Sequence, residues 1–250
     1  MVRITLDKPY ISIPVPEPDP TPISVKYGYL YPLFTFLIEK KATSSDGWRV
    51  PTRTEWEDIS ITAGGNSVAG GKLKSTRTSP TADPKWNTPN TGATDLYNLS
   101  FLPGGFRSDD GSGAYSGKNT MGIFWTSQVY DLPTLIYHMA ALFNNSAALV
   151  IDVLGAYSGL SVRLLRDATT EELLLDDGTA CEDYVSNDNH LYPTVKIGSY
   201  VMLAVNLAET KYRDGSDIPL IEDASSWGDI AVQSTGARCA YDNNEDNVLI

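Results

Sequence analysis

Residues 47–56 have the sequence GWRVPTRTEW, and this stretch decides the fold because it predicts where a helix begins. Thr52 and Glu55 stand three residues apart, the spacing of a capping box. In that motif the hydroxyl accepts from the amide three residues on, and the carboxylate accepts from the amide of the capping residue. The cap accounts for Glu55 as a structural residue, without a catalytic role.

A helix is therefore expected from about Arg53 to Thr62, ending at Gly64-Gly65. Trp56 and Ile59 are close to one turn apart, so both should face the core. The most apolar stretch of the chain, residues 27–38, lies just upstream and is also expected in the core.

Further short blocks follow the first one along the chain. They are AGGKLK at 69–74, LPGGFR at 102–107, FWTS at 124–127 and GLSVR at 159–163. In this order the blocks resemble the Fibrobacter major paralogous domain family, whose fold is similar to C-type lectins and to formylglycine-generating enzymes. The resemblance implies an α+β, C-type lectin-like, loop-rich fold. It also implies structural roles for Trp48, Thr52, Glu55, Trp56, Trp125 and Arg163.

The final part of the chain resembles the segment that this family places first, so the order of the two parts looks circularly permuted. The organisation expected from this is an N-terminal arm at 1–26 and one lectin-like domain at 27–250. The domain comprises a main part at 27–167, a connector at 168–177 and a transposed segment at 178–250. If the tail closes on its own chain, Ile250 should lie close to Tyr27. The alternative is a tail that completes an adjacent subunit.

The cysteines differ from the family pattern. The resemblance implies a disulfide pair at the positions that Ser44 and Leu164 occupy here. Loss of both partners favours assembly in a reducing compartment, where thiols stay reduced. Cys181 and Cys239 both lie in the transposed segment. A bond between them and two free thiols both remain open, because a disulfide requires close Cα atoms.

Composition narrows the function classes. The chain of 250 residues has 20 Gly, 15 Pro, 14 Tyr and 5 Trp, which favours a loop-rich β-containing fold. Its formal net charge of −12 would repel a phosphate backbone, so no nucleic-acid partner is expected. No apolar run approaches the roughly 20 residues that span a bilayer, so no membrane insertion is expected. The first residues carry no secretory signal pattern, which favours a protein that is not exported.

The arm has its own pattern. Residues 1–13 alternate weakly and favour two short strands. Prolines then fall at every second position over 14–22, which favours a semi-rigid polyproline spacer of about 28 Å. A disordered linker is the alternative. We expect residues 1–26 to contact neighbouring subunits, and the protein to form a homo-oligomer.

The remaining elements follow from local patterns. Residues 72–107 are expected to be long irregular chain with short strands, and the Gly64-Gly65 and Gly70-Gly71 pairs are expected to be turns, not a phosphate loop. Expected strands are 121–130, 147–154, 160–165 with alternate side chains in the core, 194–205 and 236–241. A helical turn is expected at 170–175, a turn at 214–215 and a short helix near 225–227.

The sequence offers little catalytic chemistry. His138 has apolar neighbours, which favours a core histidine, and His190 lies in a polar turn. Formylglycine-generating enzymes act through cysteines late in the domain, and Leu164 and its neighbours provide none. The acidic turn at 108–113 could bind calcium, but a solvated turn is the stronger interpretation. We therefore expect no enzyme, no cofactor and no metal.

These observations favour a structural protein of a bacteriophage virion, a decoration, fibre or tail component, assembled in the bacterial cytoplasm. Its partners would be other virion subunits and a host-surface glycan or protein. The loops between Trp125 and Ser161 are the expected ligand face, with ligand-binding residues Tyr130, Asp131, Asn144, Asn145 and Tyr157. The alternatives are an exported bacterial adhesin or carbohydrate-binding module at the cell surface and, more remotely, an enzyme of the formylglycine-generating type.

Overall fold

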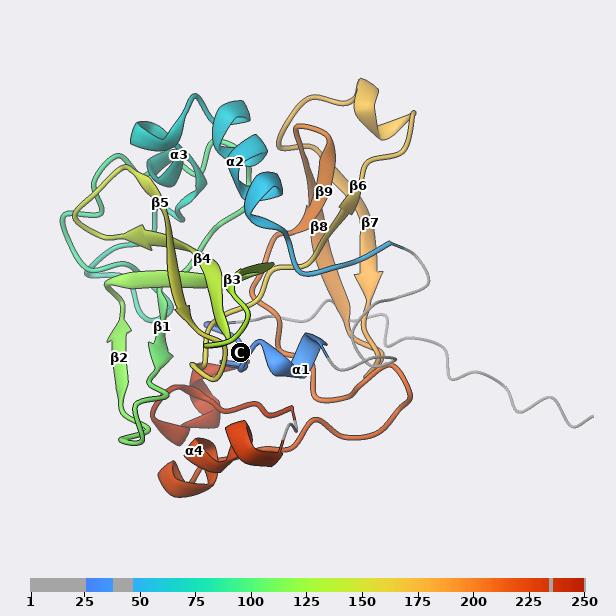
Figure 1. The fold of residues 1–250 in the computed structure, drawn as a ribbon. Coiled ribbons are helices and arrows are strands. Elements are labelled where there is room, and N and C mark those ends of the chain that lie inside the picture. Colours follow the sequence, from blue (N-terminus) through green and yellow to red (C-terminus); the bar gives the residue numbers. More distant parts are fainter. Residues whose placement is uncertain (1–25, 38–46, 234–235, 250) are drawn as a thin grey trace, which may run out of the picture.

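The computed structural model describes residues 26–37, 47–233 and 236–249 (Figure 1). The strands expected at 1–13, the proline-rich spacer and Ser44 lie outside these residues. Two β-sheets and a few short helices make up the described chain, so the fold is α+β.

The first sheet has the strand order β2-β1-β3-β4-β5. Its strands are β1 (Gly104–Arg107), β2 (Tyr115–Lys118), β3 (Met121–Asp131), β4 (Ile136–Phe143) and β5 (Leu149–Gly155). The β1–β3 pair is parallel and the other pairs are antiparallel, which makes the sheet mixed. The strands expected at 121–130 and 147–154 are confirmed as β3 and β5.

The second sheet is antiparallel, with the order β6-β9-β8-β7. Its strands are β6 (Leu165–Asp167), β7 (Ala180–Val185), β8 (Leu191–Ile197) and β9 (Tyr200–Leu203). The single strand expected at 194–205 is wrong. Gly198, with a φ of +58°, turns the chain between β8 and β9, and only glycine adopts that conformation without steric cost.

The helix predicted from the capping box is confirmed as α2 (Arg53–Thr62). The Thr52 hydroxyl accepts from the Glu55 amide at 3.2 Å, and the Glu55 carboxylate accepts from the Thr52 amide at 2.7 Å. Trp56 and Ile59 are fully buried, as their spacing predicts. The other helices are α1 (Phe34–Leu37), α3 (Asn66–Leu73), α4 (Ala224–Gln233) and the 3-10 turns η1 (Glu172–Leu174), η2 (Tyr241–Asn243) and η3 (Glu245–Asn247).

The Gly70-Gly71 pair lies inside α3, so the turn expected there is wrong. A Cβ atom on Gly70 would stand 2.2 Å from the Ala148 carbonyl oxygen, and one on Gly71 would stand 2.4 Å from that of Gly92. The two glycines therefore allow α3 to approach the neighbouring backbone closely. The eight residues of α3 have little intrinsic helix propensity, so this packing is what stabilises the helix.

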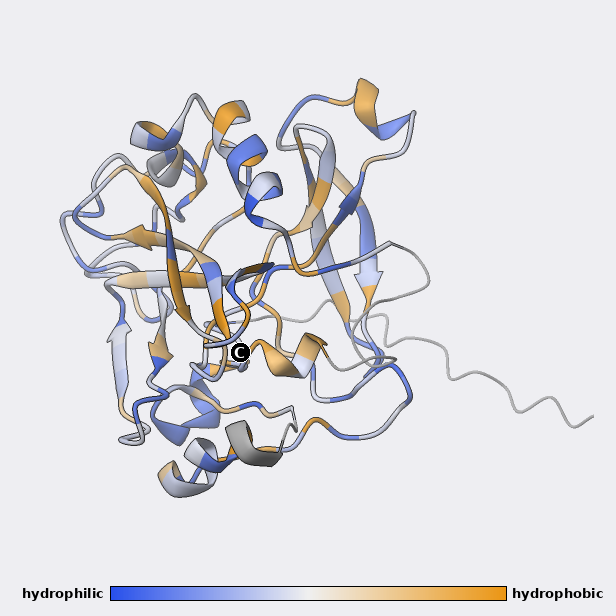
Figure 2. Ribbon diagram, viewed as in Figure 1, coloured by the Kyte–Doolittle hydropathy of each residue, from blue (hydrophilic) through white to orange (hydrophobic). Residues whose placement is uncertain are grey.

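The central strand β4 has no counterpart among the expected elements. Its residues are apolar on both faces, since Tyr137 and Met139 belong to one core cluster and Ala140 and Leu142 to another. A strand buried on both sides lacks the alternation by which strands are recognised. Figure 2 shows β4 and β5 as mostly hydrophobic, whereas β7 is polar to neutral.

The segment 160–165 differs from the expected strand. Only Leu165 belongs to a regular strand, β6, while Leu160 and Ser161 form isolated bridges. Leu160, Val162 and Leu164 do face one core cluster, but the alternate side chains are buried as well. Similarly, 236–241 forms isolated bridges, such as Cys239 to Leu30, and no regular strand.

The tail of the chain packs against its beginning. The Lys26 amide donates to the Val248 carbonyl and the Tyr27 amide donates to the Asn247 carbonyl, each at 2.9 Å. The prediction that the end of the chain lies beside Tyr27 is therefore confirmed up to Val248. In Figure 1 the red C-terminal turns adjoin the blue segment that leads to α1. The largest core cluster also combines residues of both parts, from Tyr29 to Val248.

Three cations from the sequence blocks are buried and hold loops together. Lys74, Arg107 and Arg163 have at most 1% of their surface exposed. Arg163 donates to the carbonyls of Leu99 at 2.8 Å and Leu203 at 2.7 Å, and to the Asn206 side chain at 2.7 Å. The arginine of the GLSVR block therefore connects the main part to the tail, consistent with its predicted structural role.

Both cysteines are free thiols. Cys239 is buried, with its Sγ 3.8 Å from the Leu30 carbonyl oxygen, whereas Cys181 lies on β7 and has its Sγ 3.8 Å from the Thr179 carbonyl oxygen. The question that the sequence leaves open is thus answered in favour of two separate thiols.

Candidate functional site

The five residues predicted to bind a ligand do not form one surface. Tyr130 and Asp131 end β3, and Tyr157 follows β5, at the same end of the sheet. Asn144 and Asn145 lie in the turn after β4, at the opposite end. The eight residues of β4 separate the two groups by about 27 Å at ~3.4 Å per residue. The separation was not predicted, because β4, the strand that lies between the two groups, is not among the elements expected from the sequence.

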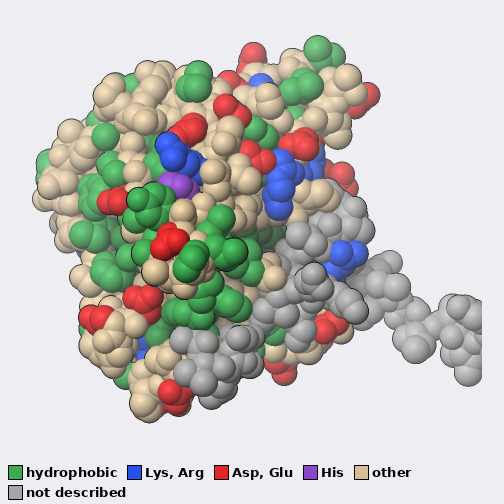
Figure 3. Space-filling model, viewed as in Figure 1, with side chains coloured by type: hydrophobic (Ala, Val, Ile, Leu, Met, Phe, Trp, Pro, Cys, Tyr) green, Lys and Arg blue, Asp and Glu red, His purple; other side chains and the backbone are tan. Residues whose placement is uncertain are grey.

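The end of β3 carries an exposed apolar group. Tyr130 and Leu132 are 63% and 62% exposed, and the Tyr130 ring meets His138 edge-on at 5.5 Å. His138 itself is buried in β4, as its apolar neighbours predict. Figure 3 shows apolar side chains gathered on this face over the strand ends beside α1.

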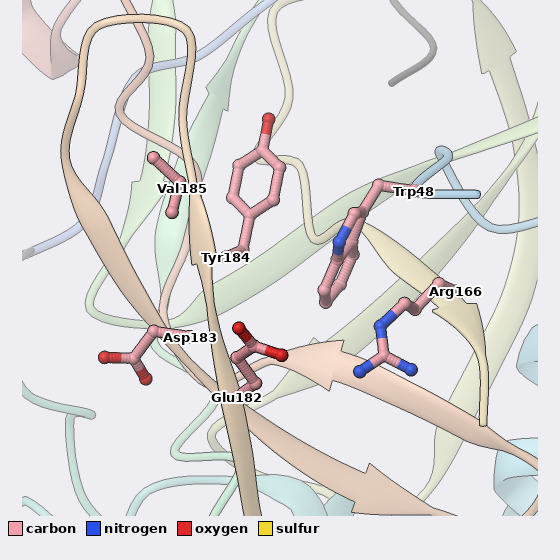
Figure 4. A pocket seen from close by; sticks show the side chains of 6 residues that line it. All are labelled: Trp48, Arg166, Glu182, Asp183, Tyr184 and Val185. Carbon is pink, nitrogen blue, oxygen red and sulfur yellow. The ribbon is translucent and has the colours of Figure 1, made fainter. Parts of the chain in front are cut away.

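A pocket lies instead beside β7, at the edge of the second sheet. It encloses about 260 Å³ and is lined by Trp48, Arg166, Glu182, Asp183, Tyr184 and Val185 (Figure 4). We call this site the β7 pocket. Two aromatic rings, a guanidinium and the Glu182 carboxylate lie around one open cavity, so charged groups make up much of its lining.

The stretch that begins the helix also builds the wall of the β7 pocket. Arg49 pairs with Leu165 in a bridge, which holds Trp48 beside β6. The Trp48 ring lies 5.2 Å from the Tyr184 ring, tilted by 56°, and the Arg166 guanidinium lies 5.4 Å from the Trp48 ring centre. Trp48 is 6% exposed, so its rings serve as a wall and not as a free stacking platform.

Arg166 is held firmly by the connector. Its guanidinium donates to both carboxylate oxygens of Glu172, at 2.6 and 2.7 Å. Glu172, the first residue of the turn η1, is held in turn by the chain before it, because its carboxylate accepts from the Thr169 amide at 2.9 Å. These hydrogen bonds, those from Arg166 foremost, lower the pKa of Glu172 to about 2. The helical turn expected at 170–175 is confirmed as η1. Through Glu172 it positions Arg166, a residue of the β7 pocket.

Glu182 and Asp183 are both exposed and consecutive on β7. Figure 4 shows the Glu182 carboxylate on the side of the strand that faces Trp48 and Arg166, and the Asp183 side chain on the other side. Within the described chain, neither carboxylate forms an ion pair.

The other sequence candidates lie elsewhere. In the acidic turn at 108–113, the Asp110 carboxylate accepts from the Ser112 amide at 2.9 Å, as in an ordinary Asx turn. Across the described residues, no group of three or more His, Cys, Asp or Glu side chains could hold a metal ion. His190 lies in the β7–β8 turn, 3.2 Å from Asp188. None of the helices in the described part of the chain could cross a membrane.

None of the residues predicted to bind a ligand lines the β7 pocket, and Trp48, which does line it, is predicted from the sequence only as a structural residue. Arg166, Glu182 and Tyr184 lie more than 115 residues from Trp48 along the chain, and only the pairing of β6, β9, β8 and β7 brings them together. The available signal was the pair of adjacent carboxylates beside a tyrosine in a short strand, which differs little from any exposed strand edge.

The fold and site define an α+β protein with one mixed sheet, one antiparallel sheet and an open polar–aromatic pocket. Comparison with protein families identifies the lineage: residues 18–166, more than half of the chain, match the Fibrobacter succinogenes major domain. The chain belongs to this family. The tail lies beyond the matched residues. No curated protein matches the chain, and no solved structure matches it either.

Proposed function

We propose that this protein is a non-enzymatic recognition subunit of a bacteriophage virion, and that it binds a host-surface glycan in the β7 pocket. The observation that carries the proposal is the pocket itself, in which the Trp48 and Tyr184 rings stand beside the Glu182 carboxylate and the Arg166 guanidinium. Apolar ring surface together with fixed polar groups suits a sugar, which has both apolar faces and hydroxyl groups.

The two acidic residues of the lining do not face each other across the cavity. Figure 4 shows the Glu182 carboxylate on the side of β7 that faces Trp48 and Arg166, and the Asp183 side chain on the other side. Glycoside hydrolysis uses two carboxyl groups that flank one bond of the sugar. Recognition is the simpler role for this set of side chains.

The proposed fold is a C-type lectin-like domain in circularly permuted order. Support comes from the close approach of residues 26–27 to 247–248, because joined ends in the usual order would meet at this point. Arg163 adds support, since it bonds the Leu203 carbonyl and the Asn206 side chain of the segment that the family is expected to place first. Domains with neighbouring ends tolerate this kind of reordering.

The virion setting rests on the sequence. The cysteine pair implied by the family resemblance is replaced by Ser44 and Leu164, the net charge is −12, and residues 1–26 have the composition of an anchoring arm. Mass spectrometry of purified phage particles, together with labelling of particles by an antibody against this chain, tests the setting. We expect many copies per particle. Detection on the bacterial envelope without phage would contradict it and favour the cell-surface adhesin.

A pair of matched variants tests glycan binding. Val185 lines the β7 pocket and is 47% exposed, so Val185→Trp should place a bulky side chain at the edge of the pocket without disturbing the core. Val150, 36% exposed on β5, provides the control Val150→Trp. On an array of bacterial surface glycans, we expect the wild type and Val150→Trp to bind the same glycans and Val185→Trp to lose them. Equal binding by both variants, or no binding by the wild type, would contradict the proposal.

A further inference from the structure

The charge of Arg166 in the β7 pocket is already neutralised. Both of its terminal nitrogens donate to Glu172, and Nη1 also donates to the Asp167 carbonyl at 3.1 Å. The hydrogen bonds with Glu172 are the main reason that the pKa of Arg166 is raised, and the charge of Glu182 adds a smaller contribution. A two-point guanidinium–carboxylate pair of this kind is among the strongest in proteins, so an anionic ligand would have to displace it.

The rim of the pocket carries an uncompensated negative charge. Glu182 and Asp183 are exposed, and neither has an ion-pair partner in the described part of the chain. An ionised carboxylate has only acceptor positions, so whatever binds there must supply hydrogen-bond donors. Of the two, the Glu182 carboxylate lies on the side of β7 that faces Trp48 and Arg166, so it is the one that a ligand in the cavity would meet.

We infer that the β7 pocket selects a ligand that carries a protonated amine, such as a deacetylated amino sugar. An ammonium group supplies three donors and the compensating charge, and it is small enough for a cavity of about 260 Å³. This inference deepens the proposed glycan-binding function and rests on it for the sugar part of the ligand. Neutral sugars would satisfy the carboxylates only by hydroxyl donors, and anionic sugars would be repelled.

The test uses three probes measured by calorimetry with the full chain. They are a glucosamine tetramer, its N-acetylated counterpart and hexylammonium. We expect the glucosamine tetramer to bind at least tenfold more tightly than the N-acetylated one, with affinity falling as salt rises from 50 to 500 mM. The double variant Glu182→Gln/Asp183→Asn should lose about tenfold in affinity for the glucosamine tetramer.

The control carries the same change of charge elsewhere. Asp152 on β5 and Asp229 on α4 are exposed, and Asp152→Asn/Asp229→Asn should leave the affinity unchanged. Equal affinity for both tetramers would overturn the amine preference while glycan binding stands. Binding of hexylammonium without either sugar would retain the amine preference and contradict the glycan function. Binding that the control variant weakens as much as the pocket variant would also overturn the inference.

Discussion

Lys74 is fully buried and connects the loop around Thr91 to the turn that follows β4. Its ammonium group donates to the carbonyl oxygens of Thr91 at 3.0 Å, Phe143 at 2.8 Å and Ser146 at 2.8 Å, and lies 5.2 Å from the Trp86 ring centre. All three donors of the ammonium are therefore used. Lys74 thus gives these loop carbonyls the hydrogen-bond donors that backbone amides would provide in a helix or a sheet.

Replacing this lysine should be costly. We expect Lys74→Met to lower the free energy of unfolding by roughly 3–5 kcal/mol, because carbonyl groups would stay buried without their donor. Urea denaturation followed by tryptophan fluorescence measures the change. Lys72→Met, two residues earlier on α3 at a half-buried position, is the control and should change stability by less than about 0.5 kcal/mol. Similar losses for both variants would contradict the role of the three bonds.

Glu209 is a second buried residue whose burial should affect the stability of the protein. Its side chain lies under the β7–β8 turn, where it accepts from the Asn187 amide at 2.5 Å and from the Tyr184 hydroxyl at 3.5 Å. Burial, opposed in part by the Asn187 hydrogen bond, raises the pKa of Glu209 to about 8. The neighbouring Asp188 charge acts in the same direction as burial.

This shift predicts the direction of a pH effect. Between the ordinary glutamate pKa near 4.3 and a pKa of about 8, the folded chain keeps a proton that the unfolded chain releases. The contribution of Glu209 is therefore complete below pH 4 and is lost as pH rises to 8, by at most ~1.4 kcal/mol per pH unit. Urea denaturation of wild type and Glu209→Gln at pH 5, 6.5 and 8 should show the variant gaining relative to wild type as pH rises. The exposed Glu222→Gln serves as control, and parallel pH profiles for wild type and Glu209→Gln would contradict the assignment.

At the scale of elements, two helical glycines offer a matched comparison. A Cβ on Gly70 in α3 would overlap the Ala148 carbonyl oxygen at 2.2 Å, whereas Gly228 in α4 has no atom within 4 Å of that position. Alanine is a better helix former than glycine by about 1 kcal/mol. We expect Gly228→Ala to raise stability by ~0.5–1 kcal/mol and Gly70→Ala to lower it by several kcal/mol, because backbone cannot move aside cheaply. Thermal unfolding of both variants decides the matter, and a stabilised Gly70→Ala would show that α3 does not pack this closely.

Elements were predictable where the deciding contacts are local. The capping box of Thr52 and Glu55 specifies the start of α2 within four residues of chain, and Gly64-Gly65 specifies its end. The β4 strand was missed because its two buried faces remove the alternating pattern, and α3 was missed because its glycines make sense only beside Ala148 and Gly92. Propensity was overridden by packing in both cases.

For the whole molecule, the order of the two parts of the chain can be exchanged by design. A chain that begins at Asp176, continues to Ile250, and is joined through a short Gly-Ser linker to residues 26–175 keeps the Arg166–Glu172 pair on one continuous segment. Because Lys26 and Val248 are already hydrogen bonded, the linker has a short distance to close. We expect a folded monomer with a stability within ~2 kcal/mol of the parent.

Circular dichroism, urea denaturation and light scattering measure the outcome for the reordered chain. A reordered chain that stays unfolded, while the parent folds as a monomer, would contradict closure of the tail on its own chain. A parent that exchanges its tail between subunits would instead appear as a dimer or larger species, and its reordered form would become monomeric.

The candidate site could be predicted from the sequence only in part. Trp48 belongs to the 47–56 block and is predicted to be structural, which agrees with its burial. Its place in the wall of the β7 pocket, however, depends on β6 and β7. The ligand residues expected at Tyr130, Asp131, Asn144, Asn145 and Tyr157 were grouped by their position in one loop-rich stretch. The strand β4 divides that stretch and carries them to opposite ends of the sheet.

The sequence by itself determined the family, the capped helix α2 and the strands β3 and β5. It predicted the approach of the tail to the beginning of the chain as one of two arrangements, and the structure shows that contact. Each of these depends on short motifs or on the order of blocks, which a linear chain displays directly. Only the tertiary structure decided that β4 is central, that α3 contains two glycines and that Trp48, Arg166 and Glu182 share a pocket. These features depend on contacts between residues far apart in the chain. Such contacts stabilise the fold, but they leave no pattern in the local sequence from which they could be predicted.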